Sequence, residues 1–255
     1  MSKYRVWADL SPWLTTIAFF LLWEIGCRLL GIPSFILPAP SQAIAALIEF
    51  WPGIWLNAAH TLFTTLLGFA MAVAIGAALG VTVGASPLIY RAVNPLLIGF
   101  NSIPKVALVP ILVLWFGIGT VPAVLTAFLV AFFPITVNVA TGIVTMEPEL
   151  ADVLRSLGAS KLDILLKVGV PRTLPYFFAS LKVAITLAFV GAVISETVAA
   201  NAGIGYLMLT ASSTFRVPLV FAALLVIAAM GILMYAAAAL VERRYTRWAT
   251  RVVTG

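Results

Sequence analysis

The chain contains 255 residues, of which 63% are hydrophobic and 9% are charged, and its mean hydropathy is +1.13. This composition is that of a polytopic integral membrane protein and excludes a soluble fold. The formal net charge of +6 does not indicate a nucleic acid partner, because the basic residues gather at the ends of apolar segments, where they orient a protein in the membrane. Cys27 is the only cysteine, so an intramolecular disulfide is impossible.

Six apolar segments are long enough to cross about 30 Å of hydrocarbon as helices. They fall at residues 13–31, 58–84, 94–117, 121–145, 176–199 and 218–241. We therefore expect an all-α membrane protein with six transmembrane helices, folded as a single transmembrane domain over residues 1–255. Lys3 and Arg5 precede the first segment as they would in a secretory signal. However, Glu24 and Arg28 follow its apolar run and no small-x-small cleavage site is present, so we expect a retained helix.

The basic residues predict how the chain is oriented. Twelve of the 15 Lys and Arg residues lie at one set of span ends, Arg28 and Arg216 lie at the other, and Lys105 lies within a span. The twelve are Lys3, Arg5, Arg91, Arg155, Lys161, Lys167, Arg172, Lys182, Arg243, Arg244, Arg247 and Arg251. This asymmetry places both termini and the 146–175 loop in the cytoplasm, which requires an even number of spans.

A short helix is expected between the first two spans. Leu37-Pro-Ala-Pro40 breaks the chain, and Ser41 is a suitable N-cap for the segment that follows. Apolar residues then recur at helical spacing, so we expect this segment to lie on the outer face of the membrane.

Small residues repeat every four positions along the second span. They are Gly68, Ala72, Gly76, Gly80 and Gly84. Such a stripe lets another helix backbone approach closely, and tight helix packing is the simpler interpretation. A direct part in gating is the alternative.

Lys105 lies between Pro104 and Pro110 in the third span, where the two prolines predict an irregular backbone. A charge at membrane depth is costly and usually faces a cavity or a partner. Lys105 is therefore a candidate contact for an anion in a translocation pathway, and snorkelling to the cytoplasmic headgroups is the alternative. Glu24 and Arg28, four residues apart on one helix, are expected to pair with each other.

The 146–175 loop predicts a helix–turn–helix beside the membrane. Leu150, Val153, Leu154 and Leu157 form one apolar stripe, and Glu149, Asp152, Arg155 and Ser156 occupy the other face. Gly158 supplies a left-handed stop, and Ser160 with Asp163 resembles a capping box for a second helix that Pro171 closes. For a generic membrane protein, this would be an ordinary amphipathic connection.

Glu196, near the outer end of the fifth span, is a candidate to line the pathway or its outer gate, together with Asn201. Capping of its own helix is the alternative role for Glu196. His60 is the sole histidine and has no Cys, Asp or Glu at ligand spacing, so an interfacial polar residue is expected there and no metal site. No catalytic constellation and no phosphate-binding Gly-x-x-x-x-Gly-Lys-Ser/Thr loop is present in the sequence, so this chain is not expected to hydrolyse ATP by that route.

The loop resembles the cytoplasmic coupling motif of ATP-binding-cassette importer permeases: Glu-Ala-Ala, three residues, Gly, nine residues, Ile-x-Leu-Pro. Asp152 stands at the Glu position and Gly158 at the Gly, while Val168, Val170 and Pro171 match the final element. The sequence departs from the motif where Val and Leu replace both alanines. On this resemblance the ATPase-coupling residues are Glu149, Asp152, Arg155, Gly158, Ala159, Val168, Val170 and Pro171.

Three further stretches are similar to the permeases of the nitrate, sulfonate, taurine and bicarbonate group. They are Ile103-Pro-Lys-Val-Ala-Leu-Val-Pro110 running into Leu114-Trp-Phe-Gly-Ile-Gly119, Ser195-Glu-Thr197, and Gly203-Ile-Gly-Tyr-Leu207. The resemblance implies a type I importer permease fold in a bacterial inner membrane, and a homodimer joined by two cytoplasmic ATP-binding subunits and a periplasmic substrate-binding protein. ATP and Mg would bind the ATPase subunits, and no cofactor would bind this chain.

The function predicted is therefore a non-catalytic permease subunit that forms the pathway for a small, anionic solute such as a sulfonate, taurine or nitrate, by alternating access. Within this interpretation the cargo is alternatively an aromatic carboxylate or a pyrimidine-type vitamin precursor. An ion-gradient-driven secondary transporter is the rival from another class, and it needs intramembrane carboxylates for ion coupling. A membrane enzyme is the second rival. Co-purification of an ATPase separates the importer from the secondary transporter.

Overall fold

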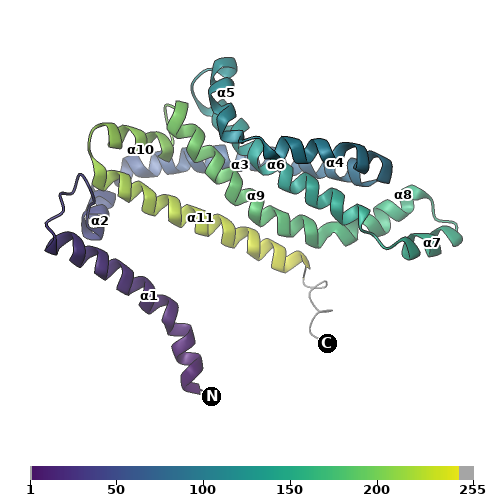
Figure 1. The fold of residues 1–255 in the computed structure, drawn as a ribbon, viewed down its shortest axis with the longest axis horizontal. Coiled ribbons are helices and arrows are strands. Elements are labelled where there is room, and N and C mark those ends of the chain that lie inside the picture. Colours follow the sequence, from purple (N-terminus) through teal and green to yellow (C-terminus); the bar gives the residue numbers. More distant parts are fainter. Residues whose placement is uncertain (1, 247–255) are drawn as a thin grey trace.

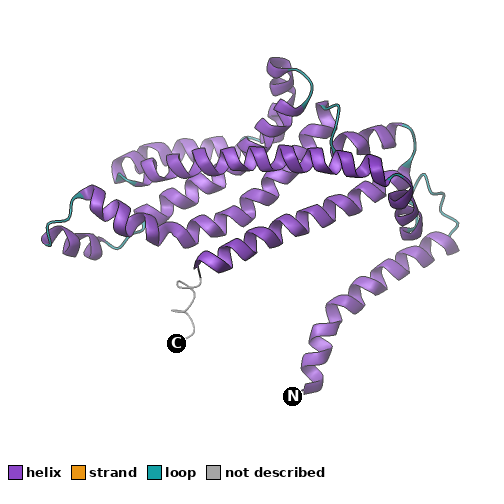
Figure 2. Ribbon diagram, turned by 180° about the vertical axis from the view of Figure 1, so that it is seen from behind, coloured by secondary structure: helices purple, strands orange, loops and turns teal. Residues whose placement is uncertain are grey.

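The computed structural model describes the backbone of residues 2–246, and the side chains of residues 11–246 except that of Pro148. Within these bounds the chain consists of helices joined by short loops, without a strand (Figure 2). The helices are α1 (Ser2–Leu29), α2 (Pro40–Glu49), α3 (Trp51–Gly84), α4 (Pro87–Ser102), α5 (Val109–Phe116), α6 (Thr120–Val144), α7 (Pro148–Ser156), α8 (Lys161–Ile164), α9 (Val170–Ala199), α10 (Ile204–Ser213) and α11 (Val217–Thr246). A 3-10 helix, η1 (Lys105–Leu108), precedes α5, and a π-helix, η2 (Leu165–Gly169), joins α8 to α9.

Three long helices, α3, α6 and α9, form the centre of the bundle, with α11 packed alongside α9 (Figure 1). Their shared core is built mainly of small and β-branched residues. It comprises Ala72, Ala127, Ala131, Ile135, Val139, Ile143, Ala184, Ala188 and Ala192. With no hydrophobic force between helices in lipid, close van der Waals contact holds such helices together, and alanine allows that contact.

The stripe of small residues on α3 faces α6, so the predicted packing role is confirmed. A Cβ atom on Gly68 would lie 2.6 Å from the Ala127 Cβ atom, and one on Gly80 would lie 2.7 Å from the Val139 Cβ atom. Both distances are far below van der Waals contact. Glycine is therefore required where the two helix backbones meet.

Four helices in the described part of the chain are long and apolar enough to cross a membrane. They are Trp51–Gly84, Thr120–Val144, Lys161–Ala199 and Val217–Thr246. The pair Pro87–Ser102 and Lys105–Phe116 adds a fifth span if it is counted as one, although it is bent by 77°. The helix α1 covers most of the first predicted segment, ending at Leu29, but is not among these spans, so the count of six stays a prediction.

The prediction of one span over residues 94–117 was wrong in its shape, because the chain breaks between α4 and η1. Ile103 is extended, with φ −71° and ψ 128°, as expected for a residue that precedes proline. Pro104 has no N–H group with which to continue α4. The irregular backbone predicted around Lys105 is present as η1.

The N-cap predicted at Ser41 was also wrong, because α2 begins at Pro40 and its N-cap is Ala39. The Ser41 hydroxyl donates instead to Glu24 Oε1, at 2.8 Å, and its backbone N–H donates to Glu24 Oε2, at 3.0 Å. Arg28 Nε donates to the same carboxylate at 2.6 Å, so the predicted Glu24–Arg28 pair is present. This cluster ties the end of α1 to the start of α2.

We predict that Gly68→Ala destabilises the protein by about 1–3 kcal/mol, because the added methyl group overpacks the contact between α3 and α6. Gly53→Ala on the same helix is the matched control, since nothing lies within 4 Å of a Cβ atom at Gly53. The control should be neutral or slightly stabilising. Thermal unfolding of both variants in one detergent measures the difference, and equal midpoints would contradict the packing role.

Candidate functional sites at the two ends of the bundle

The helices α7 and α8 protrude at one end of the bundle, and α10 lies at the opposite end (Figure 1). Gly158 ends α7 in the left-handed conformation, with φ +85°. Its N–H donates to the Arg155 carbonyl at 2.9 Å, and the Ala159 N–H donates to the Leu154 carbonyl at 3.0 Å. These two bonds satisfy the last carbonyls of α7 and turn the chain toward α8. The helix stop predicted at Gly158 is confirmed.

The capping box of the second helix is confirmed as well. The Asp163 N–H donates to the Ser160 hydroxyl at 3.1 Å, and the Ser160 N–H donates to the Asp163 carboxylate at 3.3 Å. These reciprocal bonds satisfy donors that the first turn of α8 leaves free.

The prediction that Pro171 closes this second helix was wrong. The chain passes from α8 through η2 directly into α9, and Pro171 lies in the first turn of α9. In η2 the Val170 N–H donates to the Leu165 carbonyl, five residues back. This wider turn relieves the clash between the ring of Pro171 and the carbonyl of Lys167, four residues before it. Val168, Val170 and Pro171 therefore lie on one continuous helix that leads into the membrane.

Four large apolar side chains on this loop are exposed. Their exposed fractions are 57% for Val153, 78% for Leu157, 63% for Leu162 and 56% for Leu166. The other two members of the predicted apolar stripe, Leu150 and Leu154, are partly buried. Half of the stripe is therefore exposed. Together with Leu162 of α8 and Leu166 of η2, its exposed residues Val153 and Leu157 form an uncovered face, which we call the loop face.

Several charged residues lie on the same loop as the loop face. Glu149 is exposed, and Arg155 Nη1 donates to the Asp152 carboxylate at 2.6 Å. The loop is also bound to α9 by Arg172, whose Nη2 donates to Glu147 Oε1 at 2.6 Å. This hydrogen bond and the positive charge of Arg172 lower the pKa of the Glu147 carboxyl below its usual value.

Lys105 lies at the break between α4 and α5. Its Nζ donates to the backbone carbonyl of Asn101 and, at 2.7 Å, to the Asn101 side-chain carbonyl. The same ammonium group lies 4.9 Å from the ring centroid of Phe133. Phe133 stacks in turn with Phe100, which is 58% exposed. An ammonium group, an amide and two stacked rings therefore meet where the helix is broken.

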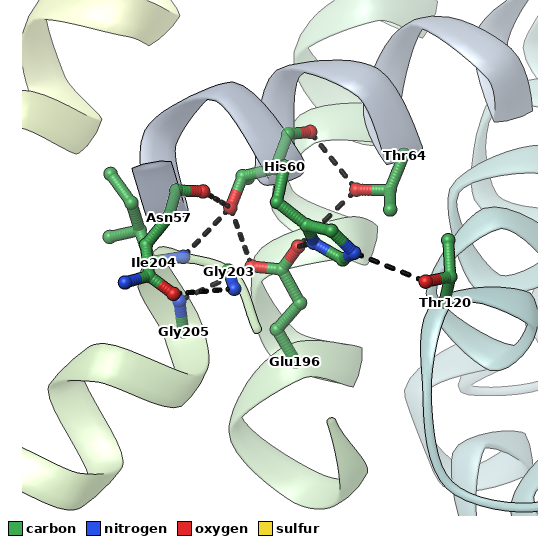
Figure 3. A network of polar contacts seen from close by, with 9 residues as sticks. Asn57, His60, Thr64, Thr120, Glu196, Gly203, Ile204 and Gly205 are labelled. Carbon is green, nitrogen blue, oxygen red and sulfur yellow. Dashed lines mark hydrogen bonds and ion pairs between the residues drawn. The ribbon is translucent and has the colours of Figure 1, made fainter. Parts of the chain in front are cut away.

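Glu196 is completely buried near the end of α9, in a network formed by α3, α6, α9 and α10 (Figure 3). Thr61 Oγ1 lies 2.7 Å from Glu196 Oε2, and Thr64 Oγ1 lies 3.3 Å from Oε1. The Gly205 N–H, in the first turn of α10, donates to Oε2 at 3.2 Å. We call these residues, with His60, Asn57 and Ile204, the Glu196 network.

The start of α10 is held by the same network. The Ile204 N–H donates to the Thr61 hydroxyl at 2.8 Å, and the Gly203 N–H donates to the Asn57 side-chain carbonyl at 2.8 Å. A Cβ atom at Gly205 would clash with the Val193 carbonyl, so α10 lies too close to α9 for a larger residue. Glu196 thus caps α10 and not its own helix, which corrects the capping alternative.

The contact between His60 and Glu196 was not predicted from the sequence. His60 Nδ1 lies 3.6 Å from Glu196 Oε1, and His60 Nε2 lies 3.1 Å from the Thr120 hydroxyl. No local motif signals a contact between positions so far apart in the chain. Asn201, predicted beside Glu196, lies exposed in the loop between α9 and α10, outside the Glu196 network.

The bundle, its broken helix and its protruding loop define a polytopic α-helical membrane protein. Residues 71–247 match the family described as binding-protein-dependent transport system inner membrane component. This match covers well over half of the chain, which therefore belongs to that family of ATP-binding-cassette importer permeases.

Relatives match along nearly the whole chain. The formylaminopyrimidine transport permease protein ThiX of Halalkalibacterium halodurans is 33% identical, over 96% of this chain and 98% of its own length. The riboflavin transport system permease protein RibX of Chloroflexus aurantiacus is 34% identical, over 95% of this chain and 91% of its own. Other relatives are permeases named for aliphatic sulfonates, taurine and nitrate, which confirms the predicted group.

The fold is shared with a subunit of the MetNI methionine ABC transporter, solved in inward-facing conformations. The TM-score is 0.59 and the identity 20%, over 77% of this chain and 96% of that one. The predicted type I importer permease fold is thereby confirmed. Permeases of this family are inner-membrane components that work with ATPase subunits and a substrate-binding protein.

We predict that Thr61→Val destabilises the protein by about 1–3 kcal/mol, because it removes a hydroxyl that bonds both Glu196 and the Ile204 N–H. Thr186→Val is the matched control, since the exposed Thr186 hydroxyl donates only to the Lys182 carbonyl of its own helix. Denaturation midpoints in the same detergent compare the two variants. Equally small changes would show that the Glu196 network adds no stability.

Proposed function

We propose that this chain forms the translocation pathway of an ATP-driven importer as a homodimer in a bacterial inner membrane, surrounded by lipid. Two cytoplasmic ATPase subunits would bind ATP and Mg, and a periplasmic protein would deliver the solute. The chain itself would bind no cofactor and catalyse no reaction. Of the twelve basic residues that predict cytoplasmic termini, Lys3, Arg5, Arg247 and Arg251 lie outside the residues whose side chains the structure describes.

The loop face carries this proposal. Four exposed apolar side chains on the protruding loop are costly in water and mark a surface for a protein partner. The charged side chains of Glu149, Asp152 and Arg155 provide a polar rim around that surface. An apolar centre with a charged rim suits a groove on a folded ATPase subunit.

The continuity of α8, η2 and α9 supports transmission of movement from this surface. Val168, Val170 and Pro171 belong to the helix that enters the membrane, and Arg172 fixes that helix to the start of the loop through Glu147. A displacement of the docked loop therefore moves α9 as a rigid element, which is how alternating access would be driven. Gly158 and Ala159 set the angle between α7 and this helix.

The broken helix supports a pathway along α4, η1 and α5. Irregular backbone at membrane depth is tolerated where it is covered by protein or lines a water-filled cavity, and discontinuous helices often form solute sites. Lys105 at the break would attract an anionic solute. Glu196 and Asn201, near the opposite end from the loop, would belong to the outer gate region.

The cargo we favour is small and anionic, on the strength of Lys105. A planar heteroaromatic cargo is the second candidate, because the Phe133 ring lies beside the ammonium group and stacks with Phe100, and rings bind flat solutes by stacking. ThiX and RibX, named for a pyrimidine and a flavin, are relatives that favour this candidate. An ion-gradient-driven transporter loses support because the chain belongs to a binding-protein-dependent family.

We predict that Gly158→Val uncouples import while the permease stays in the membrane at normal abundance. The left-handed conformation strains a β-branched residue at a cost of about 1–3 kcal/mol, so the loop face is misdirected. ATP-dependent uptake by the co-expressed complex, and co-purification of the ATPase, are the measurements. Gly26→Val is the control, because a side chain there meets nothing within 4 Å and φ is not positive. Full import by Gly158→Val would remove the main support for coupling through the loop.

We predict that Lys105→Met inserts and assembles normally but slows import of an anionic solute by roughly tenfold, as expected for loss of about 1.4 kcal/mol. Lys105→Arg is the matched control because it keeps the positive charge. Uptake of an anion and of a neutral solute is compared at limiting and saturating supply. Unchanged anion uptake by Lys105→Met would make the lysine an anchor at the headgroups instead.

A further inference from the structure

His60 and Glu196 face each other across the Glu196 network without a hydrogen bond. Glu196 is fully buried, and the His60 side chain is 24% exposed. The His60 Nδ1 atom is buried and has no hydrogen-bond partner within the described residues, although Glu196 Oε1 lies only 3.6 Å away. The other ring nitrogen, Nε2, lies 3.1 Å from the Thr120 hydroxyl. Figure 3 shows the imidazole between the carboxylate and the first turn of α6.

We propose that His60 and Glu196 form a proton-operated clasp, with His60 as the residue that positions Glu196 and ties it to α6. When Nε2 of a neutral imidazole donates to Thr120, the lone pair of Nδ1 faces the carboxylate, and two acceptors oppose each other. A proton taken from water onto Nδ1 makes that nitrogen a donor. The 3.6 Å separation then shortens to a charge-assisted hydrogen bond, typically 2.7–2.9 Å long.

Few other charged groups lie near His60 and Glu196. Among the elements that pack around the pair, α3 contains no charged residue besides His60, and α5 and α6 contain none. The charged residues of α11 lie near its C-terminal end, at Glu242, Arg243 and Arg244. Tyr206 is the titratable residue of α10, and its phenol makes no hydrogen bond to either partner in the described structure. In α9 the nearest charged residue is Lys182, about 21 Å along the helix from Glu196 and paired with Glu242 at 2.6 Å. A proton on His60 therefore neutralises the buried carboxylate locally, and its loss leaves a lone buried charge, which is unfavourable.

The clasp joins segments at the end of the bundle opposite the loop. Glu196 holds the start of α10, and Thr120 begins α6 directly after Gly117 and Gly119, whose positive φ values of 77° and 142° mark the joint with α5. The Gly119 N–H also donates to the Ala199 carbonyl at 3.3 Å. A closed clasp therefore links α9, which holds the start of α10 through Glu196, to the start of α6 through His60. If the orientation given under the proposed function holds, the proton comes from the outer side, and acidity there holds the outer end closed.

The test uses the fact that His60 is the only histidine of the chain. The permease, purified with a tag that contains no histidine, is labelled with ¹⁵N-histidine and placed in lipid nanodiscs. The ring signals then report both nitrogens of His60 directly. We expect Nδ1 to carry a proton at pH 5.5 and to lose it by pH 8, and Glu196→Gln to abolish the hydrogen-bonded Nδ1 signal. A ring that keeps one neutral tautomer over this whole range would overturn the proposal.

A second measurement follows the position of α10. Spin labels on Leu56→Cys in α3 and Ser212→Cys in α10, in a Cys27→Ser background diluted with unlabelled chain, report the distance between the two helices at both pH values. We expect the ratio of closed to open populations to fall by at least about tenfold between pH 5.5 and 8. In His60→Gln the ratio should be the same at both pH values. Thr186→Val, away from the network, should behave like the parent chain.

A parent chain without pH dependence, or a His60→Gln variant that keeps it, would overturn the clasp. Neither measurement depends on ATP, on a partner subunit or on the cargo. A failure of the importer proposal would show itself as absent co-purification or uptake, with both spectroscopic results unchanged, so the two failures are distinguishable.

Discussion

The burial of the Glu196 carboxylate is the constraint on which the end of the bundle opposite the loop depends. An acidic side chain without contact with solvent requires hydrogen-bond donors, and here they come from Thr61 and Thr64 of α3 and from the backbone of α10. Because these donors lie on α3 and α10, the Glu196 carboxylate of α9 is fully hydrogen-bonded only when both of those helices are in place. A polar requirement thus fixes an arrangement that apolar packing in lipid would specify weakly.

The middle of the bundle is held in a different way. Glycines on α3 let the backbone of α6 approach closely, and the stabilising energy of this interface comes from many short apolar contacts. Such an interface is stiff, since any side chain added at Gly68 or Gly80 has no free space. The molecule therefore combines a rigid apolar centre with the loop face at one end and the Glu196 network at the other.

Local features could be predicted from the sequence because neighbouring residues determine them. The Gly158 stop, the Ser160 capping box and the Gly68 stripe depend on residues within a few positions or on one helix surface. The bend at Pro104 was foreseen only as irregularity, since its direction depends on packing against α6. The contact of His60 with Glu196 was beyond sequence reasoning, because residues far apart in the chain show no common pattern until the helices are placed. Ser41 was assigned to the wrong role because the competing acceptor, Glu24, lies on another helix.

The continuous helix from Lys161 to Ala199 gives these two ends a mechanical connection. It contains 39 residues, so it behaves as a lever about 58 Å long, anchored in the loop at one tip and carrying Glu196 near the other. A tilt of only about 5° around its midpoint moves each tip by roughly 2.5 Å, which is nearly the length of a hydrogen bond. A displacement of that size preserves contact between broad apolar surfaces, but it is sufficient to break the hydrogen bonds between a carboxylate and its donors. A small movement of the loop would therefore break the hydrogen bonds of Glu196 at the opposite end of this helix.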